Sequence, residues 1–81
     1  MRVLKSIIID DELHGRNNLH SLLKSYCPEI NVIGKAASAS EARKMIYELN
    51  PDVVFLDINM PQMSGFELLE SLSEKNFLTV L

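Results

Sequence analysis

Hydrophobic residues along the chain follow two alternating patterns, short continuous runs and longer stretches with helical spacing. The continuous runs occupy residues 3–9, 30–36, 53–56 and 77–81. Short apolar runs rich in β-branched residues are typical of strands that are covered on both faces. We therefore predict four strands, of which the second, INVIGKA, is polar enough to lie at the edge of a sheet.

The three stretches between these runs are predicted to be helices. In the first, the spacing predicts a buried face of Leu19, Leu22, Leu23 and Tyr26 and a wetter side with Arg16, Asn17, His20 and Lys24. Pro28 ends this helix, because proline disfavours helical geometry in the residue before it.

The other two predicted helices each begin with the spacing of a capping box. The second starts at Ser38 and Glu41, buries Ala42, Met45, Ile46 and Leu49, and ends at Asn50-Pro51. The third starts at Ser64 and Glu67, runs over residues 66–72, and closes at Asn76.

Strands and helices alternate regularly with short connections, which favours an α/β fold with a parallel sheet and right-handed crossovers. With 81 residues, the chain holds at most one domain. It ends inside the fourth predicted strand, so we expect it to be a piece of a larger domain.

The amino-acid composition and charge indicate which kinds of partner the chain could bind. Hydrophobic residues make up 47% of the chain, the net charge is −3, and the eight Lys and Arg residues are scattered along it. This predicts a soluble domain without a nucleic-acid or membrane surface. Cys27 is the only cysteine, which excludes an internal disulfide, and no apolar run is long enough for a signal peptide or membrane helix. We expect a reduced, cytoplasmic location, with Cys27 as a half-buried apolar residue at a helix end.

The candidate chemistry is acidic. Asp10 and Asp11 follow the first predicted strand, and Asp57 follows the third. If these strands are neighbours, three carboxylates converge at the edge where open α/β sheets bind ligands. Mg²⁺ would offset their repulsion, since it prefers oxygen ligands and takes one or two carboxylates plus a phosphate. A carboxylate beside Mg²⁺ can also attack phosphorus and form an aspartyl-phosphate.

Simpler interpretations compete with this one. Strand-end carboxylates are often only solvated, and Glu12 is expected to be an ordinary first-turn helix acid. His14 and His20 lie six residues apart, so they do not share a helix face. Both are expected at the surface, and the sequence has no zinc-ligand spacing.

Three segments carry a resemblance to a known family. IIIDDE at 7–12, PDVVFLDINMP at 51–61 and SGFELL at 64–69 are similar to the receiver domain of bacterial two-component response regulators. The acidic pair followed by Arg16, together with the second segment, resembles the LytTR-type transcriptional regulators within that family.

The resemblance implies a role for the residues of these motifs. Asp57 would be the phosphoacceptor that takes a phosphoryl group from a sensor histidine kinase. The implied Mg²⁺ ligands are Asp11 directly, Asp10 mainly through water, Asp57, and the backbone carbonyl of Asn59. Pro61 and Gly65 would shape the loop after the acceptor.

The family fold is a flavodoxin-like sheet of five strands in the order 2-1-3-4-5. Residues 1–81 would form a partial receiver domain, with strand order 2-1-3-4 and three helices, that lacks the last helices and strand five. The phosphate-contacting hydroxyl and lysine of the family would also be missing. Thr79 lies too early in its strand to be that hydroxyl residue, and Lys75 lies at a helix end.

The expected function is a phosphorylation-dependent switch, not an enzyme, that controls transcription through a DNA-binding output domain outside this sequence. Its expected partners are the kinase and a second copy of the chain. An alternative is a dimerising interaction module without phosphotransfer, because the missing elements would leave apolar faces exposed. A haloacid dehalogenase-type phosphatase is disfavoured, since Asn59 stands where that motif has its second acid.

Overall fold

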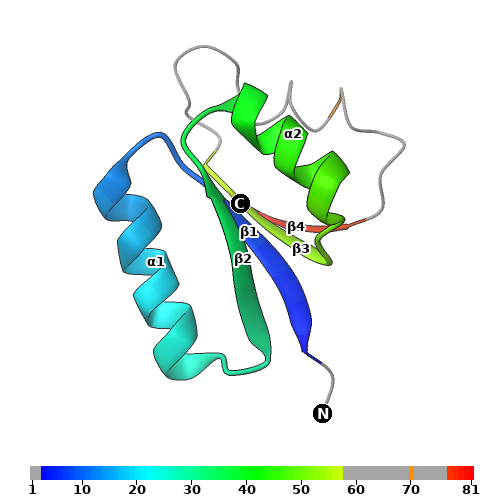
Figure 1. Cartoon of the computed structure of the whole chain (residues 1–81). Helices are drawn as coiled ribbons and strands as arrows, with labels where there is room; N and C mark the ends of the chain where they lie inside the picture. The colour runs from blue at the N-terminus through cyan, green and yellow to red at the C-terminus, as the bar shows by residue number, and fades with distance from the viewer. Residues whose placement is uncertain (1–2, 58–69, 71–76) are drawn as a thin grey trace.

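The structure is a computed structural model that describes residues 3–57, 70 and 77–81. Its elements are β1 (Leu4–Ile9), α1 (Leu13–Tyr26), β2 (Ile30–Ala36), α2 (Ala39–Leu49), β3 (Val53–Leu56) and β4 (Leu78–Val80). The strands pair in parallel in the order β2-β1-β3-β4. Figure 1 shows α1 on one face of this sheet and α2 on the other.

This arrangement confirms the predicted α/β fold, a flavodoxin-like parallel sheet with strand order 2-1-3-4. β2 and β3 have the predicted bounds, and β2 lies at an edge of the described sheet, as its polar residues indicate. Of the three predicted helices, the described residues contain two, α1 and α2. The third, predicted over 66–72, lies almost entirely outside the described residues, as do Ser64, Glu67 and Asn76.

The main core lies between α2 and the sheet. Ala42 and Ile46 of α2 are buried in one cluster with Ile7, Ile9 and Val54 of the strands. Full burial of an isoleucine or valine side chain contributes about 1.5–3 kcal/mol, so this layer supplies much of the stability of a small domain. The α2 stripe predicted from helical spacing is therefore the one that packs on the sheet.

Both ends of α2 are fixed by the predicted residues. The Glu41 N–H donates a 3.2 Å hydrogen bond to the Ser38 hydroxyl, which satisfies a donor of the first turn. Asn50 ends the helix in the left-handed conformation with φ 46°, which asparagine adopts more readily than most residues. Met45 and Leu49 are partly buried and extend the core toward this end.

α1 packs over β1 and β2 on the other face, but with a different side from the predicted one. Leu23 is buried and Leu19 is half-buried, as predicted. Leu22 and Tyr26 are 47% and 78% exposed, so their predicted burial is wrong.

The side of α1 that faces the sheet includes residues predicted to be wet. Arg16 and His20 are half-buried, and Cys27 at the C-terminal cap is also half-buried, as expected for a small apolar residue. The Arg16 guanidinium reaches back to the end of β1, where Nη1 donates a 2.8 Å hydrogen bond to the Asp10 carbonyl. In this orientation positions 16, 20, 23 and 27 are more buried than positions 22 and 26.

On the α1 side of the sheet, β4 carries exposed apolar residues, whereas Val53 of β3 is buried on the same face. Side chains alternate along a strand, so Phe55, Leu78 and Val80 lie on the face opposite that of the core residue Val54. Leu78 is 64% exposed and Val80 is 40% exposed. α1 packs chiefly on β1 and β2, so this apolar strip is exposed in the part of the chain that the structure describes.

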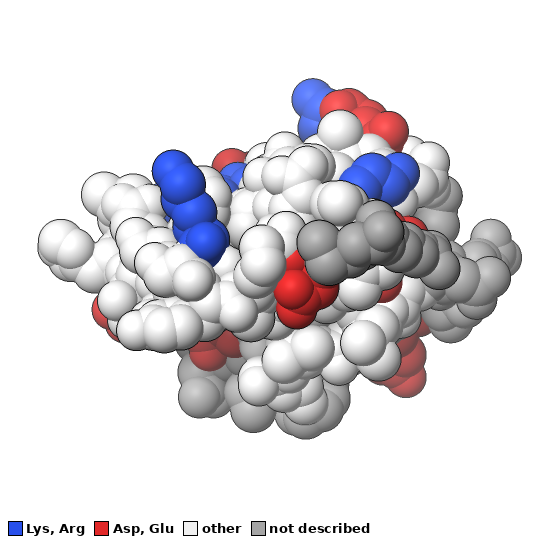
Figure 2. All heavy atoms as spheres, turned by 90° about the horizontal axis from the view of Figure 1, so that it is seen from below, with Lys and Arg blue, Asp and Glu red and all other residues white. Residues whose placement is uncertain are grey.

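Charged side chains of both signs are interspersed on the face shown in Figure 2, and the basic groups there lie apart from one another. This distribution agrees with the scattered lysines and arginines of the sequence. Neither of the two described helices is long and apolar enough to cross a membrane.

Candidate functional site

The candidate site lies where β1 and β3 end. These strands are neighbours, and their register pairs Ile9 with Leu56. The next residues, Asp10 and Asp57, therefore leave the sheet side by side. The Asp57 N–H donates a 2.9 Å hydrogen bond to the Ile9 carbonyl, and the Asp10 N–H donates a 3.0 Å hydrogen bond to the Ala36 carbonyl of β2. The sheet itself thus fixes where both aspartates emerge.

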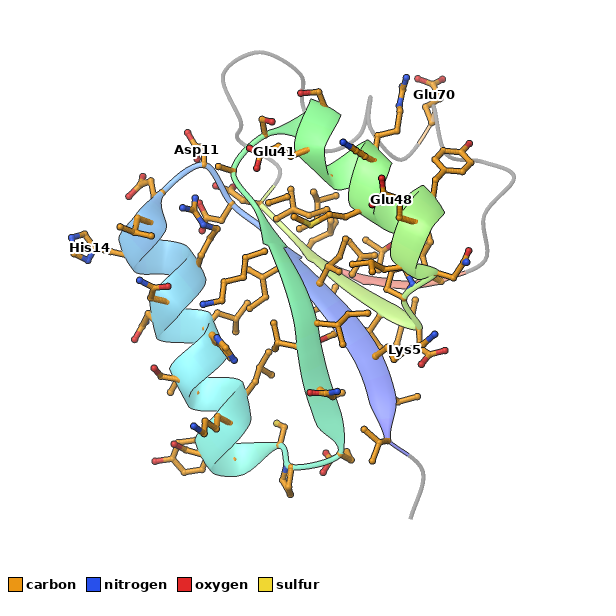
Figure 3. The ribbon with its side chains drawn as sticks, viewed as in Figure 1. Lys5, Asp11, His14, Glu41, Glu48 and Glu70 are labelled. Carbon is orange, nitrogen blue, oxygen red and sulfur yellow. The ribbon has the colours of Figure 1, made fainter. Side chains whose placement is uncertain are left out.

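Asp11 completes a group of three carboxylates at this edge. One carboxylate oxygen from each of Asp10, Asp11 and Asp57 lies within 4.8 Å of the others. Asp10 and Asp57 are half-buried, whereas Asp11 is exposed. Figure 3 shows Asp11 in the loop between β1 and α1, at the opposite end of the sheet from Lys5. The structure thus brings together the three acids that the sequence singles out.

Asp10 is held through both its side chain and its backbone. Its Oδ1 accepts a 2.9 Å hydrogen bond from the N–H of Glu12, the N-cap residue of α1. Its carbonyl oxygen accepts the hydrogen bond from Arg16 Nη1. Sequence reasoning assigned Arg16 to the wet side of its helix and missed this contact. The only feature of the sequence that pointed to Arg16 was that it belongs to the motif that resembles LytTR-type regulators.

The donor set fits a hard divalent cation. Mg²⁺ binds oxygen at roughly 2.1 Å, so two oxygens on opposite sides of the ion are about 4.2 Å apart. One oxygen of each carboxylate lies within 4.8 Å of the other two, which allows one or two direct ligands and a further contact through water. Carboxylates without cysteine or histidine favour Mg²⁺-type ions over Zn²⁺. Among the described residues, this is the one such group placed to hold a metal ion.

A cavity of about 300 Å³ opens beside these carboxylates. Asp10 and Asp57 lie on its wall with the apolar residues Ile8, Leu19 and Phe55. Most of its other lining residues are apolar, among them Leu56, Val80 and Leu81, so the polar groups of this cavity are those of the two aspartates.

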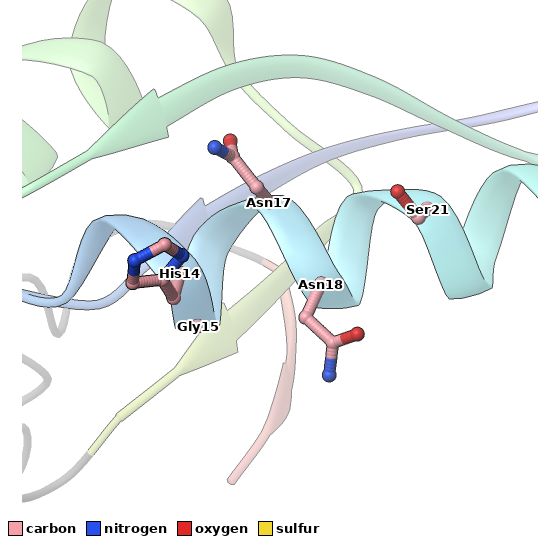
Figure 4. Close-up of a pocket in the computed structure, with 5 residues that line it drawn as sticks. All are labelled: His14, Gly15, Asn17, Asn18 and Ser21. Atoms are coloured by element: carbon pink, nitrogen blue, oxygen red, sulfur yellow. The ribbon is translucent and has the colours of Figure 1, made fainter.

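A second, larger hollow lies on the outside of α1. It has a volume of about 510 Å³ and is lined by His14, Gly15, Asn17, Asn18 and Ser21. Figure 4 shows that all five residues belong to α1, so among the residues that the structure describes a single helix lines this hollow. The cavity with carboxylates on its wall is therefore the better candidate site.

The remaining sequence candidates have different outcomes. His14 is exposed and points away from the sheet in Figure 3, as predicted, whereas His20 is half-buried rather than at the surface. Glu12 is the N-cap residue of α1 and not the predicted first-turn acid, and its N–H donates to Asp10 Oδ1. Thr79 pairs with Val54 inside β4, as expected of an ordinary strand residue. Asn59, Pro61, Gly65 and Lys75 lie outside the described residues.

The sequence is similar to a known protein family and to individual members of it. The family described as the response regulator receiver domain matches residues 7–81. The "Uncharacterized response regulatory protein" of Vibrio cholerae is 51% identical over 70 residues, which are 86% of this chain and 29% of that protein. The transcriptional regulatory protein BtsR of Salmonella typhi is 40% identical over 74 residues, which are 91% of this chain and 30% of that protein.

A solved structure agrees with these sequence matches. The crystal structure of the response regulator domain of Thermotoga maritima CheB superposes with a TM-score of 0.83 at 35% identity. The superposition covers 91% of this chain and 55% of that chain. The chain thus spans less than a third of the two relatives and about half of the solved domain.

Proposed function

Because the chain belongs to the response regulator receiver domain family, we propose that it is a phosphorylation-dependent switch in which Asp57 accepts a phosphoryl group. The observation that carries the proposal is the group of three carboxylates at the ends of β1 and β3, with one oxygen from each within 4.8 Å of the others. Asp57 directly follows a strand of largely buried residues and faces the acidic pair, which favours a nucleophile beside a metal over a solvated surface acid.

The proposed step is a transfer between two nucleophiles. A carboxylate oxygen of Asp57 forms a bond to phosphorus, while the bond from phosphorus to the histidine nitrogen of the donor kinase breaks and that nitrogen keeps the electron pair. The hydrogen bond from the Asp57 N–H to Ile9 fixes the backbone from which the attacking oxygen projects. Orientation of this kind is the main contribution that a protein makes to phosphoryl transfer, together with charge stabilisation.

The proposed Mg²⁺ ligands are those that the resemblance to the receiver family implies, and the exposure and hydrogen bonds of Asp10 and Asp11 agree with them. Asp11 is exposed and is proposed to bind the ion directly, with Asp57 and the backbone carbonyl of Asn59. Asp10 already accepts a hydrogen bond from Glu12 and is proposed to act mainly through water. When bound, Mg²⁺ would offset the negative charge of the carboxylates and of the transferring group.

Removal of the metal tests this proposal. The full chain, incubated with a phosphorylated histidine kinase or a small acyl phosphate, should incorporate phosphate when Mg²⁺ is present. Incorporation should fall to background with EDTA and return when Mg²⁺ is added in excess. The bound phosphate should be released by hydroxylamine, as expected for an acyl phosphate. Equal incorporation with and without Mg²⁺ would refute the proposed site.

The proposed output is transcription, through a DNA-binding domain outside this sequence. One relative is named a transcriptional regulatory protein, and the resemblance to LytTR-type regulators points the same way. A sensor histidine kinase as donor and a cytoplasmic location are proposed from family membership. Residues 1–81 are proposed to be part of a receiver domain, in keeping with the 55% coverage of the CheB domain. The sequence that follows Leu81 in the parent gene tests this last point.

A second candidate function is binding of another copy of the chain without phosphotransfer. It is favoured by the exposed residues Leu78, Val80 and Leu81, which are 64%, 40% and 65% exposed. β4 also lies at the edge of the described sheet, and strand edges readily pair with other chains. Light scattering at high concentration should then report a dimer, and Val80→Lys should shift it toward monomer. A wild-type chain that stays monomeric at every concentration would exclude this function.

A further inference from the structure

Gly15 is the third residue of α1, a place where its residue type is unfavourable. Glycine is among the poorest helix formers, because it loses more backbone freedom than any other residue. The backbone conformation does not require it, since none of the described glycines has a positive φ. The distinguishing feature of position 15 is that it has no room for a side chain. A Cβ built on Gly15 would overlap Oδ2 of Asp10 and lie 3.1 Å from Asp10 Cγ.

Asp10 cannot move aside without a change at the carboxylate site. Its N–H is bonded to the Ala36 carbonyl at 3.0 Å, and its own carbonyl accepts from Arg16 Nη1 at 2.8 Å, so its backbone is held on both sides. Its Oδ1 accepts the 2.9 Å hydrogen bond from the Glu12 N–H. A side chain at position 15 would therefore rotate the carboxylate, strain or break the bond to Glu12, and change its distance from the other two carboxylates.

We propose that Gly15 is a positioning residue for the carboxylate site. Its missing side chain leaves room for the Asp10 carboxylate to lie against the first turn of α1, in the orientation that brings it near Asp11 and Asp57. The inference rests on the proposed function, because it takes the three carboxylates to hold Mg²⁺. The inference goes beyond that function because it proposes that Gly15, which is not a metal ligand, influences the affinity for Mg²⁺.

Gly15→Ala in the full chain separates this role from a structural one, because the two expected effects differ in size. Alanine is the better helix former by about 1 kcal/mol, which offsets the strained bond to Glu12, so the thermal midpoint of the metal-free chain should change by no more than a few degrees. Mg²⁺ affinity, measured by calorimetric titration, should fall about tenfold, as when groups that orient a metal ligand are altered. A simple loss of folding would lower both quantities together.

A double substitution tests whether the effect passes through Asp10. In an Asp10→Asn chain, titrated at raised Mg²⁺ concentrations, adding Gly15→Ala should change the affinity by less than about twofold, because the displaced carboxylate is already absent. A tenfold loss that persists in this background would overturn the assignment to Asp10.

Gly34→Ala is the matched control. Gly34 pairs with Ile7 inside the sheet, and a Cβ there would lie 3.1 Å from Met45 Sδ and 3.3 Å from Leu49 Cδ1. This variant should leave Mg²⁺ affinity unchanged whatever it does to the thermal midpoint. Equal affinity of Gly15→Ala and the wild type would overturn the proposal for Gly15 and leave the proposed function standing. A wild-type chain that does not bind Mg²⁺ would overturn both.

Discussion

Replacing Asp57 with Asn should abolish phosphate incorporation, with a loss on the order of 100-fold or more, as when an attacking side chain is removed. An amide is neutral and a poor nucleophile, yet it has nearly the size and shape of the carboxylate. The backbone hydrogen bond from position 57 to the Ile9 carbonyl remains possible, so the end of β3 should keep its place. The measurement is hydroxylamine-sensitive phosphate labelling from a donor in the presence of Mg²⁺.

Asp52→Asn provides a matched control for this substitution. Asp52 lies just before β3, and its Oδ2 accepts a 2.9 Å hydrogen bond from the Lys5 N–H at the far end of the sheet. Asparagine retains an acceptor oxygen, so the fold and the labelling should both match the wild type. Labelling that survives in Asp57→Asn would mean that another residue accepts the phosphoryl group.

Truncating Ile46 to Ala should lower the free energy of unfolding by about 2–5 kcal/mol. Ile46 is 1% exposed and packs with Ile7 and Val54, so the removed atoms leave a cavity between α2 and the sheet. A chain of 81 residues is expected to have an unfolding free energy of about 4–12 kcal/mol, so the loss is a large part of the total. Urea unfolding followed by circular dichroism measures it.

Two further variants make this a test of packing. Ile46→Val removes a single methyl group and should cost about 0.5–1.5 kcal/mol. Lys44→Ala, on the exposed side of α2, should change stability by no more than about 0.5 kcal/mol. A loss as large for Lys44→Ala as for Ile46→Ala would show that α2 does not bury its predicted side.

The sheet could be predicted almost completely from the sequence. β3 is a continuous apolar run because it is covered on both faces, and β2 is more polar because it lies at the edge. α2 could also be predicted, since Ala42 and Ile46 repeat at helical spacing and Ser38 and Asn50 mark its ends. In each case the signal is local, and the tertiary structure agrees with it.

The orientation of α1 could not be predicted in the same way. Leu22 and Tyr26 are apolar, as are Leu19 and Leu23, and helical spacing alone does not decide which of two adjacent sides faces the strands. In the observed orientation Arg16 donates a hydrogen bond to the Asp10 carbonyl across the β1–α1 loop. Such a contact depends on the position of the helix in space, which hydrophobic spacing does not report.

Some features of the carboxylate site could likewise be predicted from the sequence, and others could not. Its three acids could be predicted because Asp10 and Asp57 each directly follow an apolar run, and the ends of neighbouring parallel strands meet at one edge. That β1 and β3 are neighbours had to be assumed from the sequence, and the structure shows it. The place of Gly15 beneath the Asp10 carboxylate could not be predicted, because it depends on atomic distances across a turn.

A single metal ion shared by Asp10, Asp11 and Asp57 is central to this interpretation, and nuclear magnetic resonance with Mn²⁺ as a substitute for Mg²⁺ measures it most directly. A paramagnetic ion broadens the signals of nearby residues first. We predict that the amide signals of residues 9–12 and 56–57 broaden at the lowest Mn²⁺ concentrations and sharpen again with excess Mg²⁺. Lys5, at the opposite end of the sheet, should stay sharp. Broadening centred on another part of the chain, or spread evenly along it, would contradict a shared site at these strand ends.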